Sequence, residues 1–163
     1  GAGRAGVGAV GVGGFPAGAG AMVCGARGTD RGAARSAGEV VENAANNGVL
    51  KGRRRQKALD AAKAMRNALK IAHAAGVKIA LGTDSGVGKH GTNAHEFTLM
   101  TTWGGLTPME SIVAGTSSGA KLLGWDAHVG SLAPGKWADI VAVPGDPLKD
   151  IKNMEHAMVV LKG

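Results

Sequence analysis

An aspartate at the end of a short apolar run is the residue of this sequence best placed to do chemistry. The run VKIALGTDSG covers residues 77–86, and its Val77, Ile79 and Leu81 favour a buried β-strand. Asp84 follows, at the kind of strand end where parallel α/β folds hold ligands and metals. A carboxylate there can bind a divalent ion and accept a proton from its bound water. The alternative is that Asp84 caps the following loop, and the residues alone leave both interpretations open.

Two neighbouring patterns could also carry chemistry. The segment DSGVGKH, residues 84–90, resembles a phosphate-binding loop, but Thr83 and His90 stand where that loop requires a glycine and a hydroxyl residue. Nucleotide binding is therefore disfavoured. His90 lies on the loop that leaves Asp84, so it is a candidate for substrate contact, and an ordinary surface position explains it equally well. The sequence contains no H-x-H or H-E-x-x-H pattern.

Helices are predicted to surround the candidate strand. The first covers 56–75 and ends at Gly76, and the second covers 94–103. A third begins at the capping box of Thr107, Pro108 and Glu110, and a fourth is capped by Thr116 and runs to Leu123. The predicted strands cover 77–83, 137–143 and 157–162. This order of elements predicts an α/β architecture with at least one parallel unit.

The first 38 residues differ in composition from the rest of the chain. They contain 13 of the 29 glycines and no lysine. Few of them can fill a core, so we expect this segment to be irregular and disordered. A second hypothesis is that GC-rich DNA was translated here in a wrong frame, and the DNA upstream of residue 39, read in all three frames, tests it.

Charge and cysteine content narrow the class of protein. The net charge is +7, and a basic run extends from Lys51 to Lys70. No aromatic residue lies among those cations to stack on bases, so a solvated helix face is favoured over nucleic-acid binding. Cys24 is the only cysteine, which excludes an internal disulfide, and the apolar runs are too short to span a bilayer. We therefore expect a cytoplasmic protein with no membrane or nucleic-acid partner.

Several ordered motifs resemble the C-terminal end of amidohydrolase-superfamily enzymes, in the imidazolonepropionase-like and Xaa-Pro-dipeptidase-like branch. They are GVKIALGTDSG (76–86), HGTNAHEF (90–97), GLTPMESIVAGTSSGAKLLG (105–124), GSLAPGKWADIVAVPGDPLKDI (130–151) and HAMVVLKG (156–163). A weaker likeness extends back to about residue 40, and residues 1–38 match nothing in the family.

The resemblance implies a metal-dependent hydrolase of small amide or peptide-like substrates, with a (β/α)₈ barrel and a small β-subdomain. The implied divisions are 1–38, the low-complexity segment; 39–125, the last helices and final strand of the barrel; and 126–163, a remnant of the β-subdomain. Asp84 matches the aspartate that the last barrel strand delivers to the metal, as ligand and proton shuttle. His90 matches a substrate-facing position, and Asp139 looks structural rather than catalytic.

The family's other metal ligands, from earlier barrel strands, have no counterpart in this sequence. Zinc, the expected ion, requires three or four ligands, and one carboxylate does not hold it. We therefore expect a truncated or frame-disrupted chain that holds no metal and is inactive alone, with an exposed sheet edge along 77–83. A homo-oligomer, a non-catalytic assembly module and a basic, Gly-rich nucleic-acid-binding protein stay open as alternatives.

Overall fold

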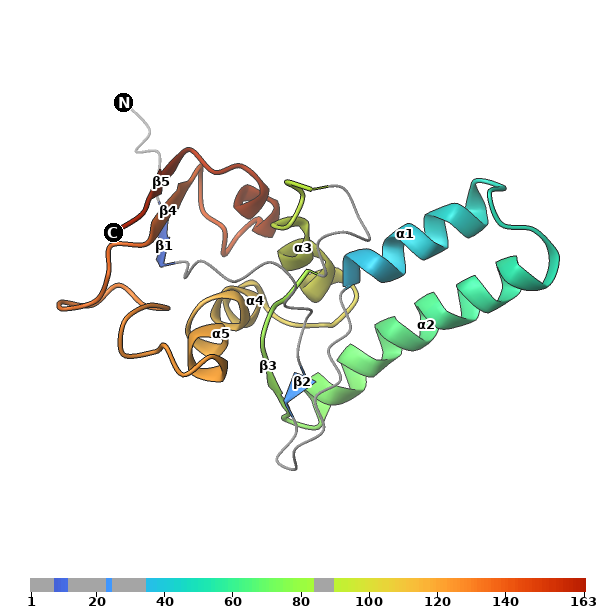
Figure 1. Cartoon of the computed structure of the whole chain (residues 1–163), viewed down its shortest axis with the longest axis horizontal. Coiled ribbons are helices and arrows are strands. Elements are labelled where there is room, and N and C mark those ends of the chain that lie inside the picture. The colour runs from blue at the N-terminus through green and yellow to red at the C-terminus, as the bar shows by residue number, and fades with distance from the viewer. Residues whose placement is uncertain (1–7, 12–22, 25–34, 84–89) are drawn as a thin grey trace.

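The computed structural model of the chain describes residues 8–11, 23–24, 35–83 and 90–163, with the first two ranges and residues 35–37 described by their backbone alone. Helices and short strands are interspersed along these ranges (Figure 1). They are β1 (Gly8–Gly11), β2 (Val23–Cys24), α1 (Arg35–Asn46), α2 (Gly52–Ala74), β3 (Lys78–Ile79), α3 (His95–Thr102), α4 (Pro108–Gly115), α5 (Ser117–Leu122), β4 (Ile140–Val143), the 3₁₀ helix η1 (Ile151–Glu155) and β5 (Val159–Leu161).

The strands form two small antiparallel sheets. In one, β4 lies between β1 and β5; in the other, β2 pairs with β3. The predicted parallel unit is not seen among the strand pairs of the described residues, which are antiparallel, and the prediction of an open edge along 77–83 holds in part, because β2 pairs with one edge of β3 over two residues. The strand itself is shorter than predicted, since only the two residues of β2 pair with it.

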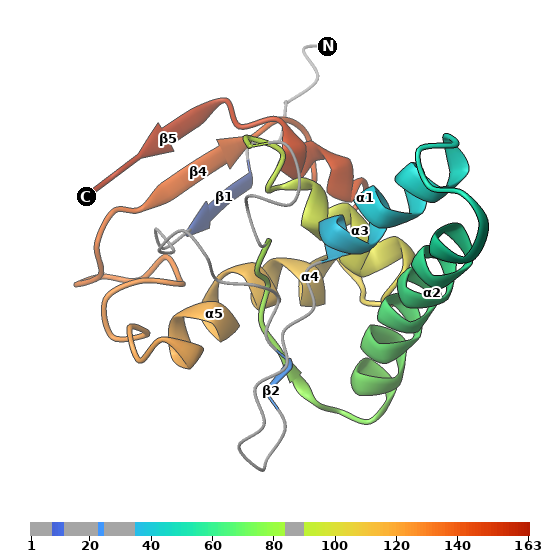
Figure 2. The same ribbon diagram turned by 45° about the vertical axis from the view of Figure 1, so that its right-hand side comes forward.

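Helices α1 and α2 form an antiparallel hairpin that extends away from the sheets (Figures 1 and 2). Ala58, Ala62 and Leu69 of α2 recur at helical spacing and are buried. The helix begins at Gly52 rather than residue 56, because the intervening residues are mainly arginines, which are good helix formers. Arg66 joins the hairpin to the next helix, since its guanidinium pairs with Glu42 of α1 and lies 4.0 Å above the Trp103 ring.

Helix α3 contributes one residue to each of two apolar clusters. Its residues from Glu96 to Met100 are all buried, and five successive residues span more than one helical turn, so the helix is enclosed on all sides. Phe97 packs with residues of β4 and η1, and Met100, one turn further along the helix, packs with residues of α2 and α4. These clusters are Phe97, Val143, Ile151 and Met154, and Leu69, Met100, Leu106 and Ala114.

Local sequence signals account for some helix ends and fail at others. Gly76, at φ +68°, follows the C-cap of α2, as predicted. The capping box at the start of α4 is confirmed: Glu110 N–H donates to Thr107 Oγ1 (3.2 Å), and Thr107 N–H donates to Glu110 Oε2 (2.7 Å). Thr116 precedes α5, but its side chain does not cap it. Its hydroxyl instead donates to the Ile112 carbonyl at 2.7 Å, back into α4.

Gly104 is predicted to be essential to the packing of α3 against α2. A Cβ at this position would lie 2.3 Å from Leu69 Cδ2 and 2.5 Å from the Met100 carbonyl oxygen. We expect Gly104→Ala to lower the free energy of unfolding by roughly 1–3 kcal/mol, measured by urea denaturation. Combined with Leu69→Ala, the loss should be smaller than the sum of the two single losses, because the shorter side chain makes room. Additive losses would contradict this explanation.

Candidate functional site

The chain segment that leads to Asp84 is held in the interior. Ala80 and Gly82 are buried, and Leu81 N–H donates to the Ala114 carbonyl of α4 at 3.0 Å. Thr83 is the last described residue of this segment. Asp84, the predicted metal ligand, lies outside the described residues, so its role stays a prediction.

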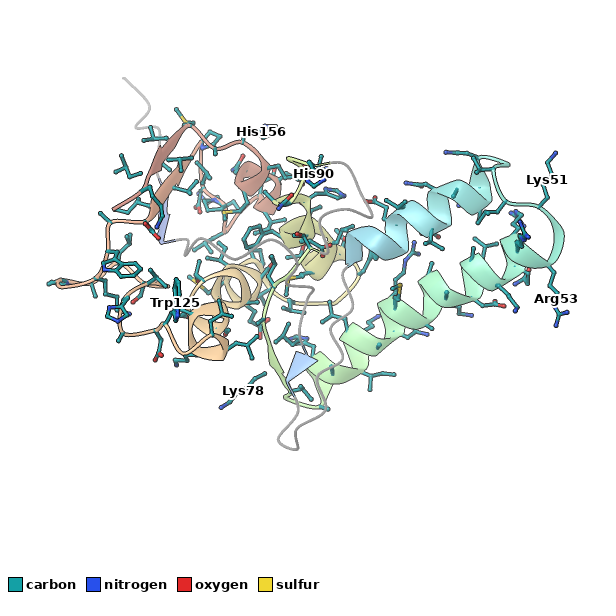
Figure 3. All side chains as sticks on the ribbon, viewed as in Figure 1. Lys51, Arg53, Lys78, His90, Trp125 and His156 are labelled. Carbon is teal, nitrogen blue, oxygen red and sulfur yellow. The ribbon has the colours of Figure 1, made fainter. Side chains whose placement is uncertain are left out.

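His90, the predicted substrate contact, is exposed on the turn that precedes α3. The turn closes through a hydrogen bond from His95 N–H to the Thr92 carbonyl at 3.0 Å. Figure 3 shows His90 on the same side of the molecule as His156, the residue that follows η1. His90 is therefore open to a ligand, and its role in substrate contact stays a prediction.

His95, which the sequence does not single out, lies between two carboxylates from distant parts of the chain. Its Nδ1 is 3.1 Å from Glu155 Oε1 of η1, and its Nε2 is 3.1 Å from Glu39 Oε2 of α1. Thr98 Oγ1 also donates to Glu155 Oε1. Only the protonated imidazole has an N–H on both nitrogens, so it is the form that donates to both carboxylates. The group ties α1, α3 and η1 together.

The electrostatics of this group favour the charged forms. Burial alone would lower the pKa of His95, but the hydrogen bond and charge of Glu155, together with Glu39, outweigh it and raise the pKa above 6.5. Burial would likewise raise the pKa of Glu155. Its hydrogen bonds from Thr98 and His95 outweigh this and lower it.

A second histidine–carboxylate pair lies beside β3. His73 Nε2, near the end of α2, is 3.2 Å from Glu110 Oε1. The backbone and hydroxyl hydrogen bonds from Thr107, with the contact to His73, lower the pKa of Glu110 to about 2. The pair lines an open hollow of about 220 Å³, whose other lining residues are mainly apolar and include Ile79 and Val113. Both Glu110 oxygens are already engaged, so the pair is suited to holding α4 against α2.

Asp139 binds the C-terminal residues of the chain. Asp139 is buried, with 4% of the residue exposed. Both of its carboxylate oxygens accept from Lys162 Nζ at 2.8 Å. Oδ1 also accepts from Gly163 N–H at 3.1 Å. These contacts join the start of β4 to the end of β5, a geometry that fits the structural role expected of Asp139.

The described residues do not fit a metal ion. Across 8–11, 23–24, 35–83 and 90–163, no three His, Cys, Asp or Glu side chains are grouped so that they could hold one. Both His95 nitrogens face carboxylates, as described above, so this ring has no nitrogen left for a metal. The chemistry of a metal site therefore depends on residues other than these.

Comparison with known families extends the likeness along most of the chain. The family model described as "Amidohydrolase family" matches residues 21–163. The match begins well before residue 39, so the prediction that residues 1–38 match nothing in the family is wrong for residues 21–38. Ochratoxinase of Aspergillus niger is 40% identical over 87 residues, which are 53% of this chain and 18% of ochratoxinase. The chain spans less than a fifth of the length of the curated relatives it matches.

Solved structures share the arrangement of these elements. A Xaa-Pro dipeptidase with methionine bound in its active site matches with a TM-score of 0.72 and 40% identity, over 78% of this chain and 32% of that chain. The A. niger ochratoxinase structure matches with a TM-score of 0.65 and 30% identity, over 78% of this chain and 30% of that chain.

The His95 group predicts a pH-dependent stability. Its raised pKa adds stability that is complete below 6.5 and is lost as pH rises through the raised value. The lowered pKa of Glu155 adds stability that is present above 4.5 and is lost as pH falls through the lowered value. Between pH 4.5 and pH 6.5 we expect His95→Gln to lower the unfolding free energy by about 1 kcal/mol or less, because the group is partly exposed. At higher pH the loss should be smaller.

Thermal unfolding across this pH range measures the effect. In a chain already carrying Glu39→Gln and Glu155→Gln, the same change at His95 should cost little, since the carboxylates are gone. A loss that is equal at every pH would show that His95 acts by packing alone.

Proposed function

Because this chain belongs to the amidohydrolase family, we propose that it is the C-terminal part of an enzyme that hydrolyses C–N bonds in small amide or peptide-like substrates. The observation that carries the proposal is the family match over residues 21–163. The likeness to a Xaa-Pro dipeptidase over 78% of the chain supports the peptide-like class of substrate.

Asp84 is the residue through which this chain would contact a divalent ion, with zinc as the expected ion. Its support is its position, directly after a segment whose Ala80 and Gly82 are buried and whose Leu81 is bound to α4. The described residues supply no set of co-ligands, and zinc requires three or four ligands. The co-ligands must therefore come from outside the described residues, while His90, exposed on the next turn, would contact the substrate.

Two measurements test this function. The 163-residue chain alone is expected to bind no stoichiometric zinc in equilibrium dialysis and to hydrolyse neither an N-acyl amino acid nor an X-Pro dipeptide. A chimaera is expected to be active if it carries residues 76–163 in place of the matching segment of the Xaa-Pro dipeptidase. In the chimaera, Asp84→Asn should lower kcat/KM by roughly a hundredfold or more.

The control for the chimaera is Asp139→Asn, which removes a carboxylate from the same segment. It should lower stability and leave most of the activity of the folded fraction. Zinc binding with hydrolysis by the isolated chain would contradict the expectation that it is inactive alone. An active chimaera that is insensitive to Asp84→Asn would contradict the role of Asp84.

The second candidate function is that of an assembly module without catalysis, and β5 favours it. This strand is at the edge of its sheet, and its residues Val159, Val160 and Leu161 are apolar and exposed. An apolar edge strand is a ready template for pairing with another chain. Light scattering after size-exclusion chromatography is expected to show a discrete oligomer with cooperative unfolding if the module assembles. A polydisperse sample would contradict this function.

A further inference from the structure

The far end of the α1–α2 hairpin carries a concentrated positive charge. This hairpin tip, residues 49–57, contains five cations: Lys51, Arg53, Arg54, Arg55 and Lys57. No aspartate or glutamate occurs between residues 43 and 59. Figure 3 shows Lys51 and Arg53 projecting at the end of the hairpin, away from the other labelled residues. The charge is therefore localised rather than spread along α2.

The fold itself uses little of this charge. Arg55 Nε donates to the Ala45 carbonyl at 3.0 Å and so joins the two helices. Lys51, Arg53, Arg54 and Lys57 are exposed, and no ion pair links them to any other described residue. Arg66, further along α2, shows the contrast, because it pairs with Glu42 and stacks on Trp103.

The position of the cations works against the helix that carries them. The three consecutive arginines fall in the first turn of α2, which contains no acidic residue, and the N-cap Lys51 makes no side-chain capping bond. The helix N-terminus is the positive end of its dipole, where cations are destabilising and anions are stabilising. An anionic partner at the tip would relieve both the mutual repulsion and the unfavourable dipole interaction.

An apolar side chain lies among these cations. Val49, in the turn between the helices, is 74% exposed. The phosphate backbone of a nucleic acid gains little from contact with a valine, whereas a bilayer interface takes up apolar groups next to cations. The combination therefore favours a lipid surface over a nucleic acid.

We propose that the hairpin tip docks on the surface of a bilayer that contains anionic lipids. Its cations would contact the headgroups, and Val49 would enter the interface. The hairpin extends away from the sheets, so a planar surface can reach the tip (Figure 2). This departs from the expectation of no membrane partner, which rested on the lack of a spanning segment. Among the described residues no helix is long and apolar enough to cross a membrane, and docking requires none.

Co-sedimentation of the full chain with vesicles tests the proposal. The vesicles are phosphatidylcholine with and without phosphatidylserine, at low and high salt. We expect binding to depend on phosphatidylserine and to weaken with salt. Arg53→Gln with Arg54→Gln should weaken binding roughly thirtyfold, because each cation near an anionic surface contributes roughly fivefold.

A matched pair of changes controls for net charge. Lys63→Gln with Lys70→Gln removes the same charge from exposed positions of α2, and Lys63 lies roughly 15 Å along the helix from Arg53. This variant should retain most of the binding. Circular dichroism shows whether both variants keep their helices.

The proposal would be overturned by binding that is independent of phosphatidylserine, by no binding at low salt, or by equal losses in the two double variants. A parallel binding measurement with duplex DNA distinguishes an anionic bilayer from a nucleic acid as the partner. We expect Val49→Ser to weaken vesicle binding several-fold and to leave any DNA binding unchanged. Tighter binding to DNA than to the vesicles at the same salt would assign the tip to nucleic acid instead.

Discussion

The packing of Phe97 and Met100, one turn apart on one short helix, into two apolar clusters fixes the positions of the neighbouring elements. Phe97 holds β4 and η1, while Met100 holds α2 and α4. Leu81, just before the predicted metal ligand, is packed against both clusters. The segment that leads to Asp84 therefore depends on α3 for its position. Substitutions far from the site can act on it through this shared core, because close-packed interiors transmit changes of volume.

Charge contacts lie around this apolar centre and contribute less to stability than it does. His95, at the first residue of α3, joins Glu39 and Glu155, while Arg66 joins Glu42 and Trp103. These groups are partly exposed, so each contributes modestly to stability. Their effect is to set the orientation of the hairpin and η1 relative to α3, whereas burial of apolar surface supplies most of the stabilisation.

Features that depend on residues close in sequence could be predicted. The capping box at Thr107 and the stop at Gly76 each involve residues within one turn, so their chemistry is complete in the local sequence. The family likeness over the second half of the chain was also recognisable, because its motifs are continuous. Thr116 shows the limit of local signals. Its hydroxyl could accept from an amide of the following helix or donate to a carbonyl of the preceding one, and it donates to the Ile112 carbonyl.

Features that depend on distant residues could not be predicted. The His95–Glu155 contact joins residues 60 positions apart, and no spacing rule relates them. The antiparallel partner of β3 comes from Val23–Cys24, in a segment whose composition predicted disorder. The family match likewise begins at residue 21, within the segment whose composition indicated no likeness. The place of the cations at the end of a helical hairpin was also hidden, because the sequence shows a basic run and not where it lies in the fold.

The pairing of β1 with β4 has a consequence for the order in which the chain folds. It brings Gly8–Gly11 against Ile140–Val143, from opposite ends of the sequence. Closing so long a loop costs entropy before any contact repays it, whereas the α1–α2 hairpin forms between neighbouring segments. The hairpin should therefore form early and the three-stranded sheet late. The pairing of β1 with β4 joins segments from the two ends of the sequence. Amide hydrogens in β1 should therefore exchange with solvent through local openings that need less free energy than most others in the chain.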